Sequence, residues 1–322
     1  MIRCVVPSET PVPMTLRLLK TLQHWFVAGS ASPTADTTNR DGVEWARIVP
    51  FALMHVVCLS VIWVGVSFVA VAVAAGLYFL RMFAVTGFYH RYFAHRSFKT
   101  SRAGQFVFAV LGASAVQRGP IWWAAHHRHH HAHSDKDSDV HSPLRRGFIW
   151  SHMGWFLSKR YFVADMSQVR DLTRFPELRL LDRFDILVPV GLAVVVFVLG
   201  IVLERIAPGL GTTRWQMLVW GFFISTVVCY HATYSINSFA HRFGSQRFDT
   251  GDDSRNNLWL ALLTLGEGWH NNHHRYPASA RQGFFWWEID ITYYLLRGLA
   301  ALGIVSDLRP VPLKIRAMQA PP

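Results

Sequence analysis

The 322-residue sequence predicts an all-α integral membrane protein with four spanning helices and a histidine-rich metal site beside the membrane. Three observations lead to this prediction. The apolar residues are gathered in long runs that contain no Asp, Glu, Lys or Arg. The Lys and Arg residues are concentrated between and beyond these runs. Among the 17 histidines, three clusters recur at matched spacing just past the ends of the runs.

The apolar runs give the expected number of spans. The first run, 48–80, has 33 uncharged residues, enough for two closely spaced spanning helices, whereas an element of a soluble core rarely needs that length. Two further runs cover 186–203 and 215–240. We therefore expect four spans. Their expected bounds are 48–64, 66–89, 186–203 and 215–236.

The first 46 residues are polar and rich in Ser, Thr and Pro, which is typical of a cytosolic tail. A cleaved signal peptide would need an apolar stretch directly after a basic start, and here the first long one begins only at Ile48. We expect a tail over 1–46 and a single membrane domain over 47–322.

The formal charge of +12 reports topology rather than nucleic-acid binding. Sixteen of the 32 Lys and Arg residues lie between Arg81 and Arg183, and only Arg205 and Arg214 lie between the third and fourth spans. By the positive-inside rule, the middle segment and both termini are cytoplasmic, in a multi-pass protein of the inner (cytoplasmic) membrane. Anionic lipid or a phosphorylated substrate is a second use for these charges.

The histidines supply the expected metal ligands, since only three cysteines occur and they form no metal-binding pattern. Residues at i, i+3 and i+4 of a helix share a face, so an HxxHH group can present three imidazoles to a common centre. Asn237 and His241 lie four apart at the end of the last span. The groups are His90 and His95, then His127, His130 and His131, and finally His270, His273 and His274.

The spacing also bears on the kind of metal. His90 and His95 diverge by about 140° on an ideal α-helix, which favours one ligand to each of two metals. Nine imidazoles shared by two ions leave positions open for exchangeable ligands, as an oxygen-activating iron pair requires, whereas a structural zinc site needs four. His126, His129 and His133 fall off this spacing and are expected outside the ligand set.

These residues and their surroundings resemble the membrane fatty-acyl desaturases of the delta-9 type. The resemblance covers 86–294, through the strings GFYHRYFAHRSFKT, WWAAHHRHHHAHSDKDSD, GFIWSHMGWFL, NSFAHRFG and GEGWHNNHHRYPASARQGFFWWEIDIT. It implies four spanning helices under a cytosolic helical cap that encloses a di-metal site. The metal ligands that it implies are His90, His95, His127, His130, His131, His241, His270, His273 and His274, with Asn237 reaching one metal through water. The flanking Trp123 and Asp139 fix the register and make His127, rather than His126, the ligand.

The resemblance implies that two iron ions (Fe2+) and O2 place a cis double bond in a saturated C16 or C18 acyl chain, at the ninth carbon. The sequence has no haem box, no cysteine quartet and no GxGxxG motif after a strand. The electrons are therefore expected from a separate protein, a ferredoxin or a small cytochrome with its reductase.

Five residues are candidates for substrate binding and ligand support. Tyr78, on the second span, could close the floor of an acyl channel, and Glu267 could orient a ligand imidazole. Lys159 and Arg160 follow the GWFLS segment and could anchor a carrier phosphate, whereas Gln117 lies in a string similar to glycerolipid desaturases. On this mixed pattern acyl-CoA is slightly favoured over a membrane acyl lipid, with acyl carrier protein third.

Two other functions stay open. Related membrane iron-histidine enzymes hydroxylate lipids or alkanes with similar histidine groups, and only the surrounding strings favour desaturation. A metal-ion transporter would need a relay of polar residues within the spans, yet of the histidines only His55 and His231 lie there.

Overall fold

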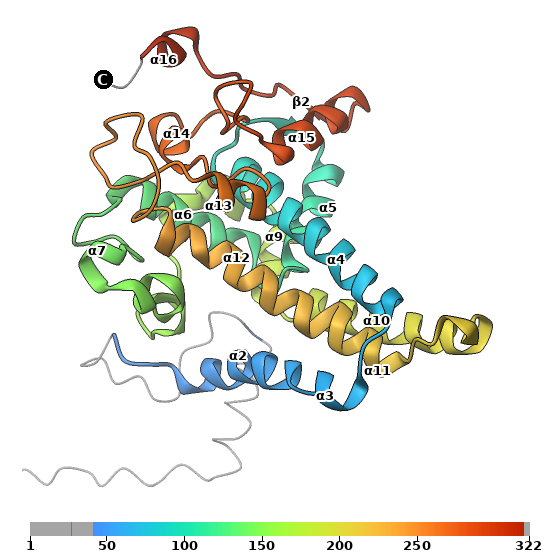
Figure 1. Ribbon diagram of the computed structural model, residues 1–322. Coiled ribbons are helices and arrows are strands. Elements are labelled where there is room, and N and C mark those ends of the chain that lie inside the picture. Colours follow the sequence, from blue (N-terminus) through green and yellow to red (C-terminus); the bar gives the residue numbers. More distant parts are fainter. Residues whose placement is uncertain (1–26, 28–40, 319–322) are drawn as a thin grey trace, which may run out of the picture.

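The computed structural model describes residue 27 and residues 41–318, so most of the expected tail over 1–46 lies outside the described residues. The described chain forms two layers, a bundle of long apolar helices and a cap of short helices and loops (Figure 1). The bundle elements are α2 (Trp45–Cys58), α3 (Val61–Val64), α4 (Phe68–Phe83), η1 (Ala84–Ala94), α10 (Leu187–Ile206), η5 (Pro208–Leu210), α11 (Arg214–Gln216), η6 (Met217–Ile224) and α12 (Ser225–Phe239).

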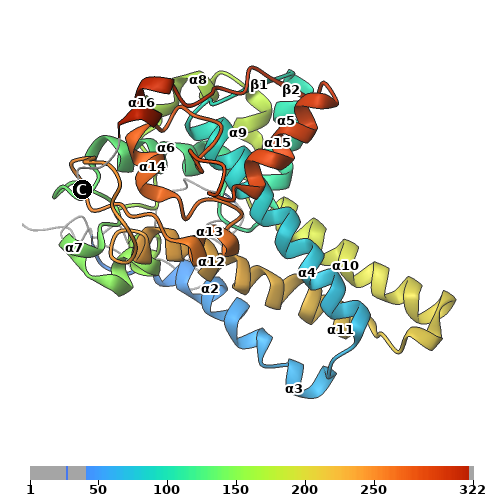
Figure 2. The same cartoon turned by 45° about the horizontal axis from the view of Figure 1, so that its top comes forward.

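The helices α2, α4, α10 and α12 run side by side away from the cap, as two views agree (Figures 1 and 2). Three continuous helices are long and apolar enough to cross a membrane: Phe68–Ala94, Leu187–Ile206 and Arg214–Phe239. They match three of the expected spans. The fourth, 48–64, is an apolar helix shorter than 18 residues that is interrupted between α2 and α3, so its passage through the membrane stays a prediction.

Close contacts hold the bundle together. A Cβ atom at Gly221 in η6 would lie 2.8 Å from Val196 Cγ1 of α10, so glycine lets these two helices pack tightly. At the end away from the cap, Thr212 Oγ1 donates to Ser67 Oγ at 2.9 Å and Gln216 Nε2 donates to the Val64 carbonyl at 2.9 Å. The loops that enter α4 and α11 are therefore tied to each other.

The histidines inside the apolar runs connect the bundle to the segment around η2. His55 Nε2 lies 3.1 Å from His231 Nε2, and His231 Nδ1 lies 3.0 Å from His152 Nε2. This series of ring contacts ends at His55, whose Nδ1 donates to the Phe51 carbonyl at 2.8 Å. Both nitrogens of His231 are engaged, so these rings link α2 to α12 rather than converge on one point.

The cap is built from the elements between η1 and α10 and from those after α12. Its strands pair antiparallel, with Lys99 opposite Ser306. The cap elements are β1 (Lys99–Thr100), α5 (Arg102–Ala113), α6 (Pro120–His133), α7 (Pro143–Arg146), η2 (Trp150–Gly154), η3 (Trp155–Leu157), η4 (Met166–Val169), α8 (Arg170–Thr173), α9 (Pro176–Arg183), α13 (Leu258–Leu263), α14 (His270–Arg275), α15 (Ile291–Ala301), β2 (Val305–Ser306) and α16 (Leu313–Ala317).

Helix α6 is held at its N-terminus by α9. Pro120 occupies the first turn, where its missing N–H costs no hydrogen bond. The Asp182 carboxylate accepts the N–H of Trp122 at 2.8 Å, and a Cβ atom at Gly119 would lie 2.4 Å from Asp182 Cα. Burial raises the pKa of Asp182 to about 6. Only glycine at 119 allows this approach, which sets the position of the histidines that follow on α6.

Candidate metal centre

Nine buried or half-buried histidines converge in two clusters between the bundle and the cap. In each cluster, one ring nitrogen per histidine lies within 4.8 Å of all the others. The first cluster consists of His90, His95, His127, His131 and His273. The second consists of His130, His241, His270 and His274. The nine histidines singled out by spacing and resemblance are thus the ones brought together.

His90 of η1 and His95, directly after η1, meet in the first cluster, and here one expectation was wrong. His90 and His95 were expected at different metals, yet His95 Nε2 lies 3.1 Å from His90 Nε2. The reason is that η1 is a π-helix, in which the His95 N–H donates to the His90 carbonyl five residues back at 3.1 Å. Residues five apart are then one turn apart and share a face.

Each HxxHH group divides its histidines between the clusters rather than offering three to one centre. On α6, His127 and His131 join the first cluster, with 3.0 Å between their Nε2 atoms, and His130 joins the second. On α14 the division is reversed, since His270 and His274 join the second cluster and His273 the first. Positions i and i+4 lie nearly in line, whereas i+3 lies to one side. Both helices therefore bridge the clusters.

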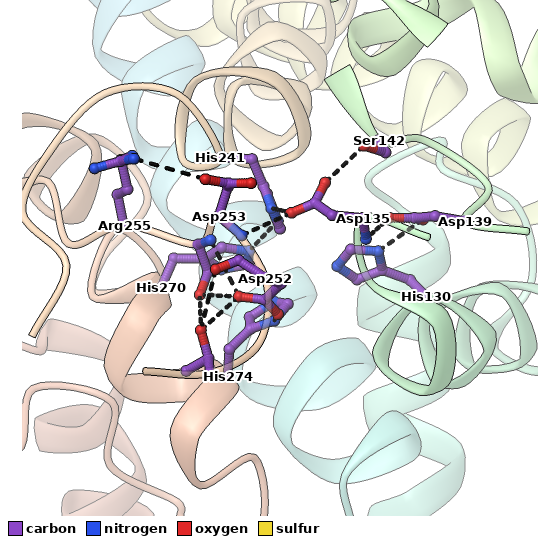
Figure 3. A network of polar contacts seen from close by, with 12 residues as sticks. His130, Asp135, Asp139, Ser142, His241, Asp252, Asp253, Arg255, His270 and His274 are labelled. Atoms are coloured by element: carbon purple, nitrogen blue, oxygen red, sulfur yellow. Dashed lines mark hydrogen bonds and ion pairs between the residues drawn. The ribbon is translucent and has the colours of Figure 1, made fainter. Parts of the chain in front are cut away.

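Carboxylates hold four of the nine imidazoles by Nδ1. His241 Nδ1 lies 2.8 Å from Asp135 Oδ2, and His274 Nδ1 lies 2.6 Å from Asp252 Oδ2 (Figure 3). An imidazole that donates a hydrogen bond from its Nδ1–H to a carboxylate keeps a lone pair on Nε2, and this Nε2 faces the cluster. The remaining two pairs are His130 with Asp139 and His90 with Glu267.

This donor set fits two metal ions. The Nε2 atoms of His90 and His273 lie 3.0 Å apart, and those of His241 and His270 lie 3.1 Å apart. Lone pairs directed at one another repel unless a cation lies between them. In the second cluster the buried Nε2 atoms of His130 and His274 find no hydrogen-bond partner among the described residues, which is unusual for buried polar atoms.

The local electrostatics favour the neutral form of most of the clustered imidazoles. His130 is an exception, because burial acts to lower its pKa but Asp139 outweighs burial and raises the pKa. Burial, followed by the neighbouring imidazoles, holds the pKa values of His127, His131, His270 and His273 well below the usual histidine range. Burial also lowers the pKa of His274, to about 4, although Asp252 opposes it. Neutral imidazole is the form that binds a metal, so none of these five has to lose a proton at neutral pH.

The supporting carboxylates were partly missed from the sequence. Burial acts to raise the pKa of Asp135, but the hydrogen bond and charge interaction with His241, together with hydrogen bonds from Ser142 and the Asp253 N–H, outweigh burial and lower the pKa to about 2. Asp252 lies in the loop between α12 and α13, 18 residues before His270. No spacing rule connects it to its partner, His274. The one available signal was an acidic pair, Asp252 and Asp253, in a basic stretch of chain.

Glu267, expected to orient a ligand imidazole, contacts the Nδ1 atom of His90. It is held in turn by Arg91, whose fully buried guanidinium lies 2.9 Å from Glu267 and 2.9 Å from Asp290. Gln282 Nε2 also donates to Glu267, at 2.8 Å. A network of buried charges therefore fixes the orientation of the His90 imidazole in the first cluster.

Two cavities adjoin the clusters. The smaller, about 50 Å³, is lined by His90 and His127 from the first cluster, by His130 and His270 from the second, and by Asn237. The larger, about 760 Å³, falls in the size range of ligand pockets. It shares His127 and Asn237 with the smaller cavity and extends along the bundle between mostly apolar walls.

Of the residues expected to bind substrate, one lines the large cavity and three do not. Gln117 lines the large cavity and donates from Nε2 to Thr233 Oγ1 at 3.0 Å. Tyr78 lines neither cavity, because its hydroxyl faces α13 and donates to the Leu263 carbonyl at 2.6 Å. Lys159 and Arg160 also lie outside the cavity walls. The position of Tyr78 gives no support to a role as channel floor.

Within the middle histidine group, His126 is directed away from both clusters. Its ring centroid lies 4.4 Å from that of Trp122 and 5.5 Å from that of Trp155, whereas His127 Nε2 lies 2.8 Å from His95 Nε2.

Comparison with known proteins gives three kinds of relative. The profile of the fatty acid desaturase family matches residues 66–304. A sn-1 stearoyl-lipid 9-desaturase of Anabaena variabilis is 35% identical, over 86% of this chain and 97% of the relative. A sn-2 palmitoyl-lipid 9-desaturase of a Nostoc strain is 35% identical, over 85% and 93%. An acyl-CoA 5-desaturase of Anemone leveillei is 35% identical, over 88% and 87%.

Proposed function

Because this chain belongs to the fatty acid desaturase family, we propose that it inserts a cis double bond at the ninth carbon of a saturated C16 or C18 acyl chain. Membership makes it an oxidoreductase of lipid metabolism. The observation that supports the finer statement is the large apolar cavity, which reaches His127 of the first histidine cluster and Asn237. A long methylene chain in this cavity would be shielded from water where it meets the metal centre.

The metal ligands are proposed as two sets. The first ion takes His90, His95, His127, His131 and His273. The second takes His130, His241, His270 and His274, with Asn237 reaching it through water. Histidine-only ligation of a pair that keeps open positions suits Fe2+, and the bound iron pair with O2 supplies the oxidising power that an unactivated methylene demands.

The protein residues then have positioning tasks. Glu267, Asp135, Asp139 and Asp252 keep their imidazoles in the tautomer that binds metal. The apolar cavity walls hold the acyl chain in place and exclude water, so that one methylene pair lies beside the centre.

Electrons are proposed to come from a separate ferredoxin, or from a small cytochrome with its reductase. The protein is placed in the inner (cytoplasmic) membrane, with the centre and both termini on the cytoplasmic side, in accord with the distribution of Lys and Arg.

The test is expression in a host that lacks unsaturated fatty acids, followed by mass spectrometry of its lipids and iron analysis of the purified protein. We expect a cis alkene, dependence on O2, and about two irons per chain by the ligand count above. A hydroxylated main product would favour the related hydroxylases instead. Full activity in a preparation without iron would overturn the mechanism.

A further inference from the structure

The large cavity reaches the outer surface of the bundle along one edge. Four of its lining residues are also about half exposed: Leu53 of α2 (52%), Val190 and Val194 of α10 (49% and 54%), and Trp215 of α11 (56%). A side chain that both lines a cavity and stands exposed marks a place where the cavity meets the surface. These residues are apolar and lie on bundle helices, so that surface faces lipid.

The position of the exposed edge follows from the packing of the helices. Both α2 and α10 pack on η6, which forms the floor between them through Leu218, Phe222 and Phe223. Val194 lies seven residues into α10, about 10 Å along the helix from its start. One leaflet contributes about 15 Å of hydrocarbon. The part of the edge formed by Val190 and Val194 therefore lies within the acyl-chain region of the leaflet next to the cap, and the edge continues to Trp215 near the other end of the bundle.

The charges around the cavity are already compensated. Among the described lining residues, Arg118 is the one with a permanent positive charge, and its Nε lies 3.2 Å from Asp185 Oδ2. Its guanidinium also lies 4.4 Å from the centroid of the Phe162 ring. Coenzyme A carries three phosphate groups, which require cations without other partners. The described cavity walls offer none.

Lys159 and Arg160, the basic pair expected to anchor a carrier phosphate, do not supply the missing cation in the cavity wall. Arg160 Nη1 lies 3.5 Å from Asp41 Oδ1. The same carboxylate pairs with Arg146, whose Nη2 lies 3.2 Å from Asp41 Oδ2. Neither Lys159 nor Arg160 lines the cavity. The arrangement of charge thus suits a carrier whose polar part stays in the membrane interface.

We propose that the substrate enters this cavity sideways from the bilayer, between α2 and α10, as an acyl chain still esterified to a membrane glycerolipid. The inference rests on the proposed function and replaces the slight preference for acyl-CoA drawn from the sequence. An acyl chain that moves from one apolar environment to another exposes no methylene surface to water on the way. The glycerol and headgroup remain at the interface, near Arg118 and Asp185.

The experiment uses the purified, iron-loaded protein in vesicles with reduced ferredoxin and no acyltransferase. Labelled 1-stearoyl phospholipid and labelled stearoyl-CoA are offered separately. We expect the phospholipid to be desaturated in the unsubstituted protein. Val194→Trp narrows the opening and should lower phospholipid turnover by at least about tenfold. Val195→Trp is the matched control, because Val195 is 63% exposed on the same helix and does not line the cavity, and its turnover should stay within about twofold.

A second pair of variants guards against misfolding. Val194→Cys and Val195→Cys are made, purified and then labelled with a bulky maleimide, with the equally treated unsubstituted protein as reference. Labelling at 194 alone should reduce phospholipid turnover. Equal turnover after labelling at 194 and at 195 overturns the lateral opening, and turnover of stearoyl-CoA alone overturns the glycerolipid carrier. Failure to desaturate either substrate with iron bound overturns the proposed function itself.

Discussion

Replacing Asp252 by Asn should weaken one of the two metal sites without disturbing the fold around it. Asp252 Oδ2 lies 2.6 Å from His274 Nδ1, and its Oδ1 accepts hydrogen bonds from Thr250 Oγ1 at 2.6 Å and from the Ser254 N–H at 3.1 Å. An asparagine that keeps its oxygen toward Ser254 presents its NH2 group to His274. That ring must then carry its proton on Nε2, where the metal would bind.

The alternative orientation of the asparagine is no better. Turning the amide places its NH2 group against the Ser254 N–H, so that two donors face each other where Asp252 had accepted. Loss of a carboxylate that orients a ligand imidazole costs about 10- to 100-fold in metal affinity. This corresponds to about 1.4–2.8 kcal/mol at the second site. The first site, which shares no ligand with His274, should keep its affinity.

The assay is competition for iron by a chelator, followed as iron per chain, with desaturase activity measured in parallel. Asp253→Asn is the matched control, since the Asp253 side chain is exposed and contacts Arg255 at 3.7 Å rather than a histidine. We expect Asp252→Asn to release one iron at 10- to 100-fold lower chelator concentration, and Asp253→Asn to behave as the unsubstituted protein. Identical release curves for the two variants would refute the role given to Asp252.

Three further outcomes follow from the same structure. His127→Ala should abolish activity and lower the iron content, whereas His126→Ala should keep its iron, and a reversal of these effects in iron analysis would show that the register is wrong. Tyr78→Phe removes one hydrogen bond to Leu263 and should cost about 0.5–1.5 kcal/mol in thermal unfolding, with an unchanged chain-length profile of the products. Arg91→Ala leaves two buried carboxylates without their cation and should destabilise the fold by about 3–5 kcal/mol, seen as a lower melting temperature; a stable variant would contradict this.

The sequence predicted the family and the histidines well, because both depend on local spacing. The HxxHH groups on α6 and α14 form helices, as their spacing requires, and the membership inferred from the surrounding strings is confirmed by the family profile. Three of the four expected spans are helices of spanning length. These features depend on hydrophobic runs and helical periodicity, which short stretches of sequence encode.

What could not be predicted depends on contacts between distant segments. Asp252 meets His274 only after the loop beyond α12 folds back, and nothing in the spacing announces it. Tyr78 was placed on a channel wall because α4 leads to His90, yet its hydroxyl donates to the Leu263 carbonyl of α13 instead. Which face of a spanning helix meets which neighbour is a property of the bundle. The sequence does not contain these contacts between helices, so it does not determine which face of a helix packs against which neighbour.

The π-helix η1 continues the α-helix α4 with a different number of residues per turn. Residues in α4 follow the ordinary helical phase, which decides what each one packs against in the bundle. Past Phe83 the phase changes, and His95 returns to the direction of His90 instead of turning about 140° away. The direction of His95 relative to His90 thus depends on the hydrogen bond between residues five apart, which η1 makes across this segment. A protein engineer who moved this centre into another helical bundle would have to copy the π-helical turn together with its histidines.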